Sequence, residues 1–137
     1  CELSDMQELR KLTKLEKLDL SGNKLINVSD LERLTNLEWL RIQHNFLTDI
    51  NGLEKLTKLR QLELNGNKLT DVKGVEKLLK LEELDLDQNK LTSIAGIEKL
   101  TNLRVLSLLR NPALTKAQID ELQKALPNCE ILSNPTK

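Results

Sequence analysis

Leucine, isoleucine and valine return along this chain in a frame of apolar and polar positions that repeats every 22 residues. One complete unit has its apolar positions at Leu37, Leu40, Ile42, Leu47, Ile50, Leu53 and Leu56. An asparagine recurs in the same frame without a slip, at Asn23, Asn45, Asn67, Asn89 and Asn111. A fixed period of this length predicts a solenoid, in which each unit forms one coil stacked on its neighbours.

Each unit changes its hydrophobic period halfway. The first half, L-x-x-L-x-L, alternates like a short strand, and the second half repeats every three residues, like a 3₁₀ or short α turn. Strands of successive coils are expected to align in parallel and in register. Because helical turns need more lateral room than strands, the sheet is expected on the concave face and the turns on the convex face. The predicted fold class is therefore α/β, a right-handed solenoid.

Polar residues at fixed places in the frame predict how its backbone groups are satisfied. An asparagine side chain both donates and accepts hydrogen bonds, so each Asn is expected to bond buried backbone groups of its own loop and of the next coil. A buried group left without a partner costs roughly 1–3 kcal/mol, which explains why the position recurs. Ser29 with Glu32, and Asn51 with Glu54, are typical of capped helix starts.

The frame predicts a single domain over residues 1–137. It divides into a partial first repeat (1–12), four full repeats with the start of a fifth (13–111), and a C-terminal helical cap (112–137). Thr115 and Gln118 have the spacing of a capping box at the start of a helix, and a last short strand is expected at 129–132. Cys129 is interpreted as a small buried hydrophobe of that cap.

Composition narrows the classes of partner. Lys and Arg together number 21, as do Asp and Glu, so no net charge attracts nucleic acid. No apolar run approaches the roughly 18 residues of a membrane span. Cys1 and Cys129 are separated by about five coils, too far for an internal disulfide, and they have no metal-binding spacing. No cofactor, metal, nucleic acid or membrane span is expected.

The complete motif, L-x-x-L-x-x-L-x-L-x-x-N-x-L-x-x-I/V, resembles the 22-residue subclass of leucine-rich repeats. That subclass is found in a regulatory subunit of protein phosphatase 1 and in bacterial internalins, and the segments 56–59 and 67–71 are especially similar to internalin repeats. The resemblance covers residues 3–111, whereas residues 114–131 resemble a helical end cap rather than the immunoglobulin-like extension of internalins. It implies protein–protein binding on the concave face and names no partner.

Cys1 has two interpretations. Counting back by the period places it on the asparagine series, where cysteine is an accepted alternative, and this favours a chain cut from a longer array. The alternative is the lipid-bearing first residue of a bacterial lipoprotein. Lipidation predicts an extracellular or cell-envelope location, and a ladder cysteine predicts a cytoplasmic one.

Alternation leaves three rows of side chains on the outer surface of the sheet. Candidate partner-binding residues come from these rows and the edge beyond them: Trp39, Arg41, Gln43, His44, Gln61, Glu63, Glu83, Asp85, Asp87, Val105 and Leu109. Exposed tryptophan is favoured at interfaces, although Trp39 can equally lie over a neighbour such as the Lys17 stem. Arg41 is expected to pair with Asp19 and Glu63. The acids beyond it favour a basic partner, or form a solvated face.

Two other classes of function compete with a binding module. One histidine, no phosphate loop and an open sheet surface give no catalytic constellation, so no enzyme is expected. The regular repeats also fit a structural or engineered scaffold without a partner of its own. Trp39, His44 and Phe46 depart from that regularity in repeat two, which makes it the expected centre of contact.

Overall fold

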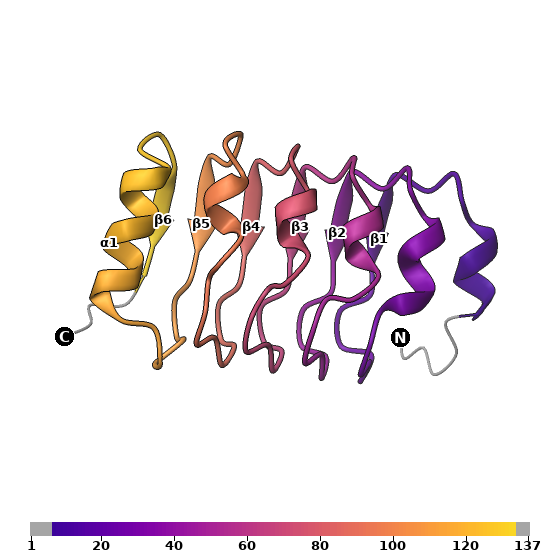
Figure 1. The fold of residues 1–137 in the computed structure, drawn as a ribbon. Coiled ribbons are helices and arrows are strands. Elements are labelled where there is room, and N and C mark those ends of the chain that lie inside the picture. The colour runs from indigo at the N-terminus through magenta and orange to yellow at the C-terminus, as the bar shows by residue number, and fades with distance from the viewer. Residues whose placement is uncertain (1–6, 134–137) are drawn as a thin grey trace.

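A computed structural model describes residues 7–133 of the chain. Its strands form one open, six-stranded parallel sheet in sequence order (Figure 1). The strands are β1 (Lys17–Asp19), β2 (Trp39–Arg41), β3 (Gln61–Glu63), β4 (Glu83–Asp85), β5 (Val105–Ser107) and β6 (Glu130–Leu132). The first five strands pair residue for residue at the repeat spacing, as in Lys17 with Trp39 and Trp39 with Gln61. The predicted parallel solenoid is confirmed.

Short 3₁₀ turns line the side of the stack opposite the sheet (Figure 1). They are η1 (Gln7–Lys11), η2 (Ser29–Arg33), η3 (Leu53–Lys55), η4 (Val75–Lys77) and η5 (Ile97–Lys99). Between the two sides, the leucines, isoleucines and valines of the frame form one continuous core. Leu12 marks its open end, because 46% of its surface is exposed while Leu34, one coil on, is fully buried.

The predicted caps of the turns at Ser29 and Asn51 are wrong. The N-caps of η2 and η3 are Val28 and Gly52, and neither turn has a side-chain cap. Instead, Glu54 reaches back from inside η3, and its carboxylate accepts a hydrogen bond of 2.7 Å from the Gly52 N–H. Because the turn has only three residues, Glu54 lies two residues after Gly52, and its own carboxylate accepts the bond from the Gly52 N–H.

The asparagine series forms a buried ladder, and it serves the preceding coil rather than the next one. The Asn67 amide oxygen accepts from the Leu47 N–H at 3.1 Å. Its amide nitrogen donates to the Ile42 carbonyl at 2.9 Å and to the Leu64 carbonyl of its own coil at 2.9 Å. The expectation of bonds to the next coil is therefore corrected. Ile42 and Leu47 belong to the coil before Asn67, and their free polar groups are the ones within its reach.

The C-terminal part of the described chain replaces the one-turn motif by a longer helix, α1 (Lys116–Ala125). The Thr115 hydroxyl accepts from the Gln118 N–H at 3.2 Å, and the Gln118 side chain accepts from the Thr115 N–H, so the predicted capping box is present. β6 then pairs Glu130 with Val105. Cys129 is buried in the core, as predicted. Cys1 lies outside the described residues.

Candidate functional site

The outer surface of the six-stranded sheet, called the sheet face below, carries most of the predicted site residues. In β2 and β3 the middle residue is buried and its two neighbours are half-buried, so the predicted alternation holds. Seven candidates lie on the strands: Trp39, Arg41, Gln61, Glu63, Glu83, Asp85 and Val105. Gln43, Asp87 and Leu109 follow the strand ends as a third row. The sheet thus brings ten of the eleven candidates onto one surface.

His44 lies at the edge of this surface and is exposed. Its φ of 56° is in the left-handed region, as are those of Gly22 and Gly66 at the same place in the frame. Its ring lies against Gly66, because a Cβ on that glycine would be 2.4 Å from the ring Nδ1. The two glycines are a signal in the sequence for this backbone geometry at His44.

Trp39 and Arg41 form the aromatic centre of the sheet face. The Arg41 guanidinium lies over the Trp39 ring, 4.8 Å from its centroid, which is a favourable cation–π distance. Trp39 thus contacts a neighbouring side chain, as one of its two interpretations held, and the neighbour over its ring is Arg41, two residues on along the same strand. Arg41 also pairs with Asp19 at 3.7 Å and closely with Glu63, as predicted.

Beyond Arg41 the three rows carry acids and no basic side chain. Glu63 and Asp85 are direct neighbours in the register, where like charges repel. Burial raises the pKa of Asp85, and the negative charges of Asp87 and Glu63 raise it further. A hydrogen bond from the Asp87 N–H lowers this pKa in part. Asp87 accepts bonds from the Ser107 hydroxyl and from the Leu109 N–H. It therefore holds the next coil, which leaves Asp85 as the electrostatically unfavourable acid.

Two hollows flank Trp39 on the sheet face. The first, of about 510 Å³, is lined by Lys17, Glu38, Trp39, Arg60, Gln61, Glu82 and Glu83. The second, of about 410 Å³, is lined by Trp39, Arg41, Gln61, Leu62, Glu63, Glu83, Leu84, Asp85, Val105 and Ser107. Trp39, Gln61 and Glu83 line both hollows. The register explains this, because these three residues are consecutive members of one row.

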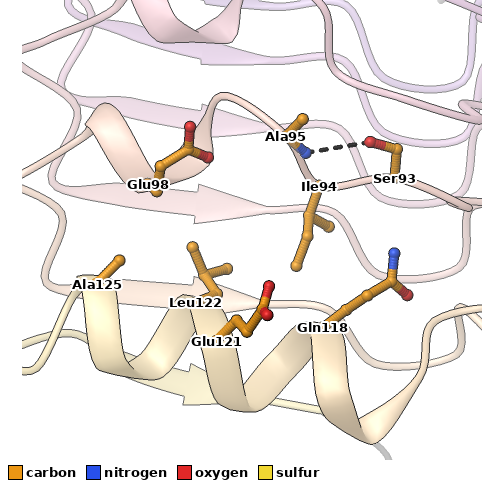
Figure 2. A pocket seen from close by; sticks show the side chains of 8 residues that line it. All are labelled: Ser93, Ile94, Ala95, Glu98, Gln118, Glu121, Leu122 and Ala125. Carbon is orange, nitrogen blue, oxygen red and sulfur yellow. Dashed lines mark hydrogen bonds between the residues drawn. The ribbon is translucent and has the colours of Figure 1, made fainter.

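A further hollow, of about 380 Å³, lies between η5 and α1. Figure 2 shows Ile94 from the last coil and Leu122 from α1 pointing toward the same space, with Glu98 and Glu121 beside it. It arises where a ten-residue helix packs against a one-turn motif. The sequence prediction missed this hollow, although the departure from the frame after Pro112 marks the place.

Within residues 7–133, no helix is long and apolar enough to cross a membrane. Nor does that range contain a group of three or more histidine, cysteine, aspartate or glutamate side chains arranged to hold a metal ion.

The coil geometry, the asparagine ladder and the single parallel sheet define a leucine-rich repeat protein. Family models for leucine-rich repeats match residues 14–34, 35–77 and 79–128, and the chain belongs to this family. Members are typically protein-binding scaffolds rather than enzymes. No curated protein matches the chain significantly in sequence.

Solved structures resemble the chain along nearly its whole length. An internalin (inlF) from Listeria monocytogenes matches with a TM-score of 0.89 and 27% identity, covering 99% of this chain and 41% of that one. An internalin C2 (inlC2) from the same organism matches with a TM-score of 0.84 and 25% identity, over 98% and 60%. A leucine-rich repeat protein from Leptospira interrogans gives 0.74 and 27%, over 95% and 40%. The chain therefore spans less than two thirds of the length of each of these structures.

Proposed function

We propose that this chain is a protein-binding module and that its sheet face, from Trp39 to Asp87, binds a protein partner with a basic surface. The observation that carries the proposal is the concentration of a half-buried aromatic ring and acidic charge on one face. The family is typically used for protein interaction, which supports the general class. The choice of the sheet face as the binding surface and the basic character of the partner are the specific claims of this proposal.

Trp39 supplies the apolar part of the argument. It is the only tryptophan of the chain, and it is half-buried between two hollows. Tryptophan is enriched among the interface residues that dominate binding energy, because a large ring buries much area at little cost in conformational entropy. A partner side chain that enters either hollow would contact this ring.

The acidic half of the face supplies the charge. A partner cation near Asp85 would offset the repulsion from Asp87 and Glu63 that the free protein tolerates. The Asn65 amide oxygen, in the third row beside Asp87, is buried without a donor in the described structure. A lysine or arginine carries hydrogen-bond donors and no acceptor, so it suits the Asp85 carboxylate.

The test is affinity capture from extracts of the organism that makes the chain. Wild type is compared with a triple variant, Trp39→Ala, Glu83→Lys and Asp85→Lys. We expect the captured partner to bind the variant at least about 30-fold more weakly, as removal of an interface residue worth about 2 kcal/mol requires.

A matched control carries Leu79→Ala, Glu32→Lys and Glu121→Lys, which remove a large apolar side chain and reverse two charges at exposed positions off the sheet face. It should keep wild-type affinity, and circular dichroism should show both variants folded. The proposal is wrong if the triple variant keeps full affinity. It is also wrong if wild type and the control capture no protein in common.

A further inference from the structure

The half-buried Trp39 ring borders two hollows and contacts one cation. That cation is Arg41, which lines the second hollow and not the first. Trp39 also lines the first hollow, and no other cation among residues 7–133 lies over its ring. The first hollow, of about 510 Å³, is therefore bordered by an aromatic side chain that no cation of that hollow occupies.

Glu83 places an unneutralised carboxylate at the far side of the same hollow. It is exposed, it accepts a hydrogen bond from the Gln61 side chain, and no cation within residues 7–133 pairs with it. Trp39 and Glu83 lie two strands apart with Gln61 between them, so their Cα atoms are about 10 Å apart at the usual strand spacing. Both side chains are long enough to contact one group seated over Gln61.

The remaining charges of the hollow do not fill this seat. Arg60 lies 3.8 Å from Glu38 and 3.6 Å from Glu82, well beyond the length of a strong charged hydrogen bond. Three acids and two bases line the hollow, since Lys17 is the only other cation. Glu82 also lies 3.9 Å from Arg104, which does not line the hollow. Glu83 is therefore the lining acid that has no ion pair within residues 7–133, and its carboxylate keeps spare hydrogen-bonding capacity.

We infer that this hollow is the seat of an arginine or lysine side chain of the protein partner. The cation lies against the Trp39 ring where that ring borders the hollow, and its charge is neutralised by Glu83. An aromatic face beside a carboxylate is the combination that binds such a cation, because the ring attracts the charge and the carboxylate supplies hydrogen-bond acceptors. This assignment rests on the proposed function and names the chemistry of its anchoring contact.

Intrinsic fluorescence offers a direct test. The chain has one tryptophan and no tyrosine, so its emission reports on Trp39 alone. The probes are a blocked glycine–arginine pentapeptide and a matched glycine–glutamate pentapeptide, each titrated into wild-type chain at low salt. We expect a saturable change in Trp39 emission with the arginine peptide, and none with the glutamate peptide.

Two variants separate the seat from general charge attraction. Glu83→Gln should weaken binding of the arginine peptide about 2- to 5-fold, which is the range of an exposed ion pair or cation–π contact. Glu32→Gln removes the same charge from η2, away from the sheet face, and should leave the affinity unchanged within error. No emission change with the arginine peptide, equal change with both peptides, or equal affinity of Glu83→Gln and wild type overturns the inference.

The outcome is separable from that of the capture experiment. A partner that is lost with the triple variant but binds Glu83→Gln as tightly as wild type refutes the cation seat and leaves sheet-face binding standing. A saturable, Glu83-dependent peptide response without any sheet-face-dependent partner supports the seat and refutes the broader proposal.

Discussion

Replacing one asparagine of the ladder is expected to destabilise the whole stack. In Asn67→Ala the side chain that bonds Leu47, Ile42 and Leu64 is lost from a site that is 6% exposed. The Leu64 carbonyl keeps a second donor, the amide of Asn89 at 3.1 Å. The Leu47 N–H and the Ile42 carbonyl keep none from another side chain. Two buried polar groups at roughly 1–3 kcal/mol each give a loss of about 2–6 kcal/mol.

Urea unfolding followed by circular dichroism and by Trp39 fluorescence measures this loss. The matched control is Asn102→Ala, whose exposed amide donates one bond of 3.0 Å to the Leu79 carbonyl and should cost under about 1 kcal/mol. Because stability in a solenoid is shared between neighbouring coils, both probes should shift together. A loss for Asn67→Ala below about 1 kcal/mol, or equal to that of the control, would refute the assignment of the ladder as a main source of stability.

Three further substitutions test the electrostatics and the backbone. The folded-state pKa of Asp85 is raised above its ordinary 3.8, so the folded chain binds this proton more tightly than the unfolded chain and stability falls as the pH rises from about 3.8 upward. Asp85→Asn should therefore stabilise the folded chain at pH 7 and leave its stability unchanged near pH 3. Urea unfolding midpoints that rise equally at both pH values would contradict this. Gly22→Ala (φ 72°) meets nothing within 4 Å and should cost about 1–2 kcal/mol, the usual cost of a left-handed residue with a side chain. Gly52→Ala (φ 104°) would place a Cβ 2.9 Å from the Ser29 Cα and should cost more, so equal thermal midpoints would contradict the packing argument.

The 22-residue frame predicts the sheet well because burial and period decide it together. The alternation that points Leu40 inward must point Trp39 and Arg41 outward, and the register follows from repeating the same unit. The pairing of Arg41 with Glu63 follows in turn from that register. Such features need only the order of polar and apolar residues and the spacing between them.

The direction of the asparagine hydrogen bonds and the contacts between neighbouring side chains could not be predicted from this frame. A period of 22 residues is the same counted forward or backward, so it does not reveal that Asn67 bonds the preceding coil. The contact of Trp39 with Arg41 rather than Lys17 depends on side-chain rotamers, which spacing leaves open. The misplaced caps have another cause. At η3 the N-cap is Gly52 with a positive φ, and its N–H donates to the Glu54 carboxylate. The capping pattern of α-helices does not describe this arrangement.

The direction of the asparagine ladder has a consequence for synthesis on the ribosome. Each coil depends on an amide that lies 20 to 25 residues further along the chain, as Leu47 and Ile42 depend on Asn67. At about 5–20 residues per second, a newly emerged coil waits about 1–5 s for the side chain that completes it. During translation the growing tip is therefore always the least stable coil, and order spreads toward it from the N-terminal side.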